Sequence, residues 1–187
     1  MKGKVIMATW KIDPVHSEVK FKVRHLVVSN VTGQFETFDA TVTSEKSDFT
    51  DAKIQFEADV NSINTKNEQR DGHLKSADFF DAANNPKITF VSKAVSKKSD
   101  NEYEIVGDLT IRGTKKEVKL AAEYNGMVKG FGGTEVIGFS IKGKLNRFEY
   151  GLQWNALTEA GGVVVSDEVR IEIDAEFSRS EEAKKAA

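Results

Sequence analysis

Most of this chain alternates apolar and polar residues with a period of two, and this pattern limits it to β structure with one buried face. The clearest runs are Lys53–Val60 (KIQFEADV), Tyr103–Ile111 (YEIVGDLTI) and Glu168–Phe177 (EVRIEIDAEF). Successive side chains of a strand point to opposite faces of the sheet. Each run therefore predicts a half-buried strand.

Comparable runs predict about eight strands in all, joined mostly by connections of turn length. The others are Trp10–Asp13 and Glu18–Arg24, which we interpret as one strand interrupted at Pro14, then Gly33–Thr43, a strand from Pro86, and runs through Val118–Tyr124 and Ile137–Leu145. No regular helices separate the runs, so parallel βαβ units are not expected. One-sided apolar faces suit an antiparallel sheet that closes on itself and so has no edges. The sequence predicts an all-β fold, an antiparallel eight-stranded barrel in a single domain.

One long stretch, Asn61–Asp81, breaks the alternation. Thr65 followed by Glu68 has the spacing of a capping box, and Asp71 and Lys75 are neighbours on a helix surface. We expect one short helix over Lys66–Lys75, and a helix of ~10 residues needs something to dock on. The apolar stretch His25–Val31 predicts a short helical turn. Gly126–Gly133 and Gly161–Gly162 predict loops, and the charged segment 179–187 predicts a frayed tail.

The composition narrows the function classes. The net charge is −2 and the pI about 6.0, so nothing draws the chain as a whole to nucleic acid or to anionic membranes. There is no cysteine, which excludes disulfides, thiolate metal sites and cysteine nucleophiles. No window approaches the ~20 apolar residues of a membrane span. The N-terminus does not read as a secretory signal. We expect a cytoplasmic protein, or a periplasmic or secreted one if a signal was removed.

The pattern leaves open whether the barrel is hollow, because eight strands enclose either packed side chains or one small ligand. The face predicted to point inward combines large and small residues. The large ones are Phe21, Phe38, Phe56, Phe139 and Phe177, and the small ones are Ala40, Ala58, Gly107, Ala122, Gly143 and Ala175. The small residues either line a tunnel or accommodate bulky neighbours. No inward face carries a regular set of charges, so a ligand would be largely apolar.

The polar candidates have structural and functional interpretations. His16, His25 and His73 could supply a three-histidine zinc site, but they have no ligand spacing, and we expect no metal and no cofactor. Arg70 and Asp71 are predicted to anchor the helix by charge-assisted hydrogen bonds. Alternatively, Arg70 or His73 meets a polar ligand head group. Arg147, which is followed by the aromatic residues Phe148 and Tyr150, is predicted to be structural, with an anionic ligand group as the alternative.

Taken in order, the segments resemble the YceI-like family, polyisoprenoid-binding proteins with a lipocalin-like barrel. The likeness covers residues 8–178 and rests on the following stretches: Trp10–Ser17, Gly33–Phe35, Ser62–Thr65, Arg70–Leu74, Asp78–Asp81, Pro86–Phe90, Gly107–Gly113, Asn146–Arg147 and Val165–Val169. One departure is visible: family members often have Asp-Phe-Gly where this chain has Glu149-Tyr150-Gly151. The resemblance implies an extended barrel, a long apolar pocket, a bound isoprenoid or other amphipathic lipid, and a homodimer. It implies no catalytic mechanism.

Three hypotheses follow. In the first, a polyprenyl chain, for example a quinone tail, lies in the barrel, and the helix with Phe79-Phe80 forms a lid or wall. The residues expected to contact it are Phe21, Phe38, Ala40, Phe56, Ala58, His73, Phe79, Phe80, Ile88, Phe90, Ala122, Phe139, Ile141, Arg147 and Phe177. The second is a hydrolase or isomerase that uses His73 with Arg70 or Arg147. The third is a packed structural barrel without a ligand.

Overall fold

The computed structural model describes residues 7–159 and 161–180, and these form a β structure with one α-helix, α1 (Glu68–Lys75). The strands, in chain order, are β1 (Ala8–Ile12), β2 (Glu18–His25), β3 (Ser29–Phe35), β4 (Phe38–Ser44), β5 (Lys53–Asp59), β6 (Ile63–Asn64), β7 (Lys87–Lys97), β8 (Glu102–Ile111), β9 (Thr114–Lys129), β10 (Glu135–Asn146) and β11 (Val165–Arg179). Short 3-10 turns cover Val60–Ser62, Phe131–Gly133 and Arg147–Tyr150.

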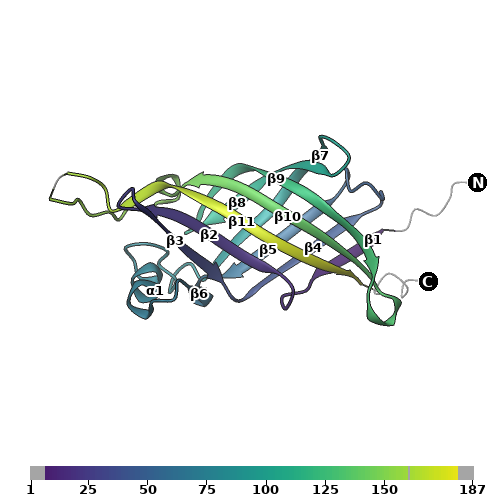
Figure 1. Cartoon of the computed structure of the whole chain (residues 1–187), viewed down its shortest axis with the longest axis horizontal. Helices are drawn as coiled ribbons and strands as arrows, with labels where there is room; N and C mark the ends of the chain where they lie inside the picture. The colour runs from purple at the N-terminus through teal and green to yellow at the C-terminus, as the bar shows by residue number, and fades with distance from the viewer. Residues whose placement is uncertain (1–6, 160, 181–187) are drawn as a thin grey trace, which may run out of the picture.

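The sheet closes into a barrel because β1 pairs with both β4 and β11 (Figure 1). β1 and β2 lie one after the other along β11, with Ile12 opposite Phe177 and Glu18 opposite Asp174. They are thus one strand interrupted around Pro14, as the sequence predicts. β3 with β4, and β5 with β6, are interrupted in the same way, since β3 pairs with β2 and β6 with β3. Counted as long strands, these make the predicted eight-stranded antiparallel barrel.

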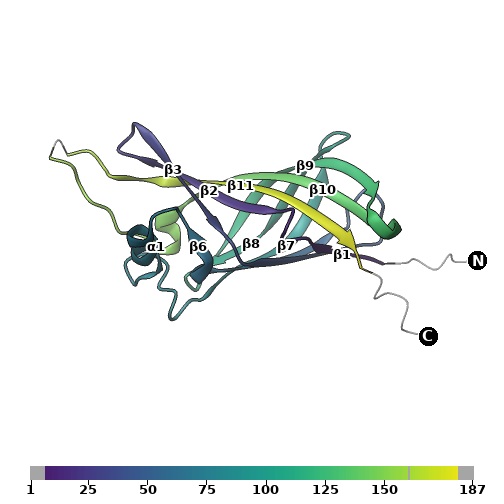
Figure 2. The same cartoon turned by 60° about the horizontal axis from the view of Figure 1, so that its bottom comes forward.

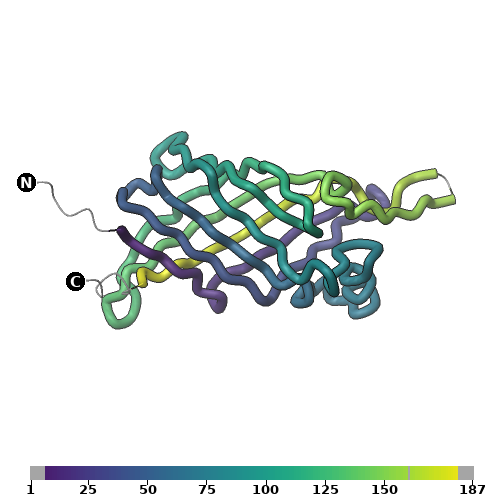
Figure 3. The backbone as a smooth tube through the Cα atoms, turned by 180° about the vertical axis from the view of Figure 1, so that it is seen from behind, coloured from purple at the N-terminus to yellow at the C-terminus, as the bar shows by residue number. Residues whose placement is uncertain are grey.

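The two ends of the barrel differ. Helix α1, the β2–β3 turn and the loop that leads from β10 to β11 lie at one end (Figure 2). The described ends of the chain leave the barrel at the other, where the Ser180 amide donates to the Thr9 carbonyl at 2.8 Å (Figure 3). The β4–β5 loop lies at this second end as well, because Ser44 pairs with Ala8. We call these the helix end and the terminus end.

Several predicted boundaries were wrong. The segment His25–Val31 contains no helical turn: residues 26–28 form the hairpin turn between β2 and β3, with Leu26 and Val27 at φ +51° and +63°, a twist that suits hairpins. Gly33–Thr43 is divided at residues 36–37. β9 continues to Lys129 and so takes in the first half of the predicted loop Gly126–Gly133, with a register shift between Gly138 and Phe139 on its partner.

At the chain's end, Arg179 belongs to β11. The rest of the predicted tail beyond residue 180 lies outside the described residues. Within residues 7–159 and 161–180, no helix combines the length and the apolar character that crossing a bilayer requires.

The helix is shorter than predicted and is capped by a different residue. Lys66 has a φ of +61°, which ends any helical path before it. Asn67 is the N-cap, and its side chain accepts a hydrogen bond from the Arg70 amide. The predicted capping box of Thr65 and Glu68 is therefore wrong, and the hydroxyl of Thr65 has other partners.

Candidate functional site

The barrel is hollow, with an internal cavity of about 570 Å³. Every residue expected to contact a ligand lines this cavity except Phe38, which begins β4 next to the break at residues 36–37. Phe38 is partly buried and packs against buried apolar side chains instead. Those that line it are Phe21, Ala40, Phe56, Ala58, His73, Phe79, Phe80, Ile88, Phe90, Ala122, Phe139, Ile141, Arg147 and Phe177. Of the two interiors that the pattern allowed, the structure has the one with space for a ligand.

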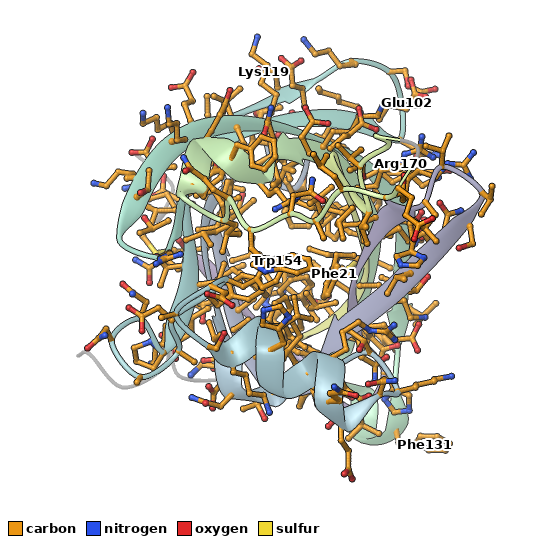
Figure 4. All side chains as sticks on the ribbon, turned by 90° about the vertical axis from the view of Figure 1, so that its left-hand side faces the viewer. Phe21, Glu102, Lys119, Phe131, Trp154 and Arg170 are labelled. Atoms are coloured by element: carbon orange, nitrogen blue, oxygen red, sulfur yellow. The ribbon has the colours of Figure 1, made fainter. Side chains whose placement is uncertain are left out.

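Burial shows which end of the cavity is open. At the helix end, the lining includes the exposed residues Asn67, Gln69 and Arg70. At the terminus end, the lining residues Phe49 and Phe177 are buried, with 7% and 5% of their surface exposed. The cavity thus opens beside α1 and is closed at the terminus end. Figure 4 looks into the open end, with Trp154 and Phe21 inside the barrel and Lys119, Glu102 and Arg170 around its outside.

Three rings meet at the opening. His73 of α1 lies edge-on to Phe79 and to Trp154, with ring centroids 5.1 and 4.8 Å apart, and Phe79 lies 5.4 Å from Trp154. His73 Nε2 is 2.8 Å from a carboxylate oxygen of Asp78, which fixes the ring. Because Trp154 comes from the loop before β11, these contacts connect α1 to the opposite side of the opening.

Arg70 and Asp71 hold the start of α1, as predicted, and they do so through one buried residue, Thr65. The guanidinium of Arg70 donates to the Thr65 hydroxyl and carbonyl, both at 2.7 Å. The carboxylate of Asp71 accepts from the Thr65 amide at 2.9 Å and from its hydroxyl at 2.5 Å. Thr65 directly follows β6, so this clamp ties the helix to the barrel wall.

Arg147 is a buried cation, 3% exposed, without a carboxylate in ion-pair contact among the described residues. Its guanidinium donates instead to the carbonyls of Leu152, Trp154, Val165 and Ser166, at 2.5 to 3.3 Å. Burial lowers the pKa of Arg147 from its ordinary value. The side chain thus fixes both the first and the last residues of the loop at the opening, which is the predicted structural role.

The structure does not bring the three histidines together as a zinc site. His25 and His73 both line the cavity, whereas His16 pairs with Asp13, with Nδ1 2.8 Å from the carboxylate. Within the described part of the chain, Asp13, His16 and Glu176 place their ligand-type atoms within 4.8 Å of one another, on the surface. The hydrogen bond between Asp13 and His16 explains why these two residues of the group lie close together.

Sequence reasoning missed two important lining residues, Phe49 and Trp154. Both lie in irregular segments, where a period of two says nothing about direction. A large apolar residue inside a polar loop, as in Ser47-Asp48-Phe49-Thr50-Asp51, is the one signal that the sequence offers for Phe49.

Comparison with known proteins finds a matching family, relatives in sequence and similar folds. The YceI-like domain matches residues 10–177. A UPF0312 protein of Staphylococcus aureus (strain USA300) is 43% identical over 176 residues, which are 94% of this chain and 100% of that protein. The fold is similar to that of Burkholderia cenocepacia BcnA, with a TM-score of 0.77 at 22% identity, covering 88% of this chain and 98% of that one.

The fold also resembles a polyisoprenoid binding domain from Saccharophagus degradans, with a TM-score of 0.64 at 15% identity, covering 91% of this chain and 98% of that one. The match to the family's domain spans nearly all of the barrel, from Trp10 in β1 to Phe177 in β11. The chain belongs to the YceI-like family.

Proposed function

We propose that the protein binds an isoprenoid or similar amphipathic lipid inside the barrel, as a carrier, a store or a sensor. The observation that carries this proposal is the cavity of about 570 Å³, within the range of small-molecule sites and lined mainly by apolar side chains. Burying apolar surface contributes about 25 cal/mol per Å², so a hydrocarbon chain binds there with few polar contacts. A similar barrel is described as a polyisoprenoid binding domain.

The position of the polar groups suggests how the lipid lies. Most polar lining residues, among them Asn67, Gln69, Arg70 and His73, border the cavity at its open end, whereas aliphatic and aromatic side chains line it toward the terminus end. We infer that the head group stays at α1 and that the chain points toward the terminus end. A head group with hydrogen-bond acceptors, such as a quinone, an alcohol or a phosphate, suits these donors.

The experiment is mass spectrometry of an organic extract from freshly purified protein, compared with a mock purification. A prenyl or quinone mass near stoichiometric level would establish the ligand. A thermal-shift series with prenyl alcohols follows, because a ligand that binds the native state raises its apparent stability. No extracted lipid and no shift with any prenyl alcohol would contradict the proposal.

Two neighbouring alanines of β9 provide matched variants. Ala122 is 4% exposed and lines the cavity, whereas Ala121 points outward. Ala122→Trp fills part of the cavity, so the thermal shift with a prenyl alcohol is expected to fall sharply. Ala121→Trp adds the same ring outside the barrel and should keep the shift. Equal shifts in two folded variants would contradict a ligand inside the barrel.

A hydrolase or isomerase that uses His73 and Arg70 is a second candidate, favoured by the hydrogen bond between His73 and Asp78. A carboxylate that orients a histidine is a common feature of general bases. The guanidinium of Arg70, however, is engaged by Thr65. The test is His73→Ala: loss of a turnover reaction with lipid binding retained would support an enzyme, and unchanged turnover would rule out this role of His73.

We also propose that the protein is a homodimer, which the family resemblance suggests. Sedimentation equilibrium at several protein concentrations measures this directly. A mass of one chain at all concentrations would contradict the dimer.

A further inference from the structure

We propose that Phe49 sets the greatest length of lipid chain that the barrel accepts. This inference rests on the proposed lipid-binding function and adds its selectivity. Phe49 belongs to the β4–β5 loop at the terminus end, where its ring lines the cavity and is 7% exposed. A chain that enters beside α1 therefore meets this ring at the far end.

Phe49 lies in a loop and not in a strand, and its ring packs against three other aromatic rings. It lies edge-on to Trp10 and to Phe139, with centroids 6.1 and 5.7 Å apart, and tilted to Tyr124 at 5.8 Å. These three residues come from β1, β10 and β9, of which β9 and β10 are paired neighbours on the wall across the barrel from the β4–β5 loop. The ring thus sits across the barrel's interior as a stopper.

The backbone of Phe49 has a conformation that a bulky residue rarely adopts. Its φ is +59°, in the left-handed region where glycine is favoured. Such outliers persist when the surrounding structure determines them, and they are frequent at functional sites. A glycine would relax the backbone here but would remove the stopper.

Hydrogen bonds within the loop keep Phe49 in place. The carboxylate of Asp51 accepts from the hydroxyl of Ser44 at 2.5 Å and from the amide of Glu45 at 2.9 Å. Asp48 accepts from the amide and hydroxyl of Thr50, and the Ala52 amide donates to the Phe49 carbonyl at 3.0 Å. The loop is thus braced on both sides of the ring, as a fixed stop requires.

The cavity is long enough for a stop to matter. On β11 its lining runs from Val165 to Phe177, twelve positions apart. At about 3.3 Å per residue this is roughly 40 Å along the strand, or roughly 30 Å along the axis of a barrel whose strands tilt by about 40°. An extended chain with its head group at α1 can therefore reach Phe49 only when it has many carbons, and longer chains must fold back or protrude.

The experiment measures binding of a series of all-trans prenyl alcohols, from geraniol through farnesol and geranylgeraniol to longer members. Affinity is followed by displacement of anilinonaphthalene sulfonate and by native mass spectrometry. For the wild type we expect affinity to rise with chain length up to a limit and then to fall. Phe49→Ala should move that limit up by at least one isoprene unit. Each buried methylene contributes a factor of about four, so affinity for the first excluded alcohol should rise by about tenfold or more.

Two further variants keep the test decisive. Phe49→Trp fills more of the terminus end and should move the limit to shorter chains, so the prediction stands even where Phe49→Ala folds poorly. Phe131→Ala makes the same substitution at a fully exposed residue outside the cavity and should leave the limit unchanged.

The outcomes separate the two proposals. A wild-type protein that binds none of the alcohols overturns both the lipid-binding function and the role of Phe49. A wild-type limit that neither substitution of Phe49 moves overturns the role of Phe49 and leaves lipid binding standing. Opposite shifts with Ala and Trp support the inference.

Discussion

At the scale of single residues, Tyr150 carries a hydroxyl that its surroundings do not satisfy. The residue is 1% exposed, and its hydroxyl has no hydrogen-bond partner among the described residues. Burial raises the pKa of Tyr150 to about 12. Tyr150→Phe, which removes only this hydroxyl, should raise the free energy of unfolding by about 1 kcal/mol. Urea denaturation measures this, and a loss of similar size would mean that the hydroxyl is bonded.

The pair of Asp13 and His16 predicts a pH effect. The hydrogen bond that the His16 ring donates to Asp13 raises the pKa of His16, helped by the charges of Asp13 and Glu176, and the same bond lowers the pKa of Asp13. Protonated His16 therefore contributes stability below its unfolded pKa, and this contribution is lost as the pH rises through the folded pKa. Ionised Asp13 contributes above its unfolded pKa, and this is lost as the pH falls.

Proton NMR of the His16 ring measures the effect. Asp13→Asn should lower the pKa of His16 toward its ordinary value of 6.5. Glu176→Gln should lower it less, because Glu176 lies 3.8 Å away and acts through its charge alone. The same pKa in the wild type and in Asp13→Asn would contradict the pairing.

Residue patterns predicted which side chains face inward but not what the small ones do. The alanines Ala40, Ala58 and Ala122 line the cavity. Gly107 and Gly143 serve a different purpose: a Cβ at either position would collide with the ring of Phe90 or the side chain of Leu120. Both uses of a small residue share the same parity, so only the positions of neighbouring side chains distinguish them.

At the scale of elements, α1 depends on its clamp, since none of its residues is buried. Thr65→Val keeps the shape of the side chain but removes the hydroxyl that Arg70 and Asp71 share. We expect faster amide exchange in residues 66–75 and a loss of about 1 to 2 kcal/mol in the free energy of unfolding. Thr41→Val, on the outer face of β4, is the control. Unchanged exchange over α1 would show that the helix is held by its other contacts.

Strands could be predicted where apolar and polar residues alternate over a long run. Turns and the start of the helix could not, because the backbone conformation of single residues determines them. β5, β8 and β11 follow the pattern closely. The turn after β2 has positive φ at Leu26 and Val27, residues that carry no turn signal. The helix start was misplaced for the same reason, because Lys66 adopts the left-handed conformation without being a glycine or an asparagine.

At the scale of the whole molecule, the chain's described ends meet. The bond between Ser180 and Thr9 predicts that a circular permutant will fold, with a short linker joining these ends and new termini in the polar turn Lys98–Asn101. We expect a similar melting temperature by circular dichroism. The contrasting permutant has its new termini between Arg147 and Leu152, where Arg147 fixes the opening. We expect this permutant to have a lower melting temperature. Equal melting temperatures in the two permutants would contradict this account of Arg147.

The number of strands and their closure could be predicted from the sequence, whereas the hollow interior could not. Whether eight strands enclose a cavity depends on how side chains fill the space between opposite walls, and periodicity describes one wall at a time. The stopper at Phe49 and the ring of Trp154 at the opening come from irregular loops, where the pattern is silent.

Because the described ends leave the barrel together at its closed end, the protein has the geometry of a cup that can be held by its base (Figure 3). A tag or a surface attached beyond residue 180, or before residue 7, is joined at the side away from α1. Immobilised molecules would then present their openings to the solution in one direction, which suits an electrode or a sensor chip that detects apolar compounds. A tether in the β2–β3 turn, at the helix end, would instead orient the openings toward the surface.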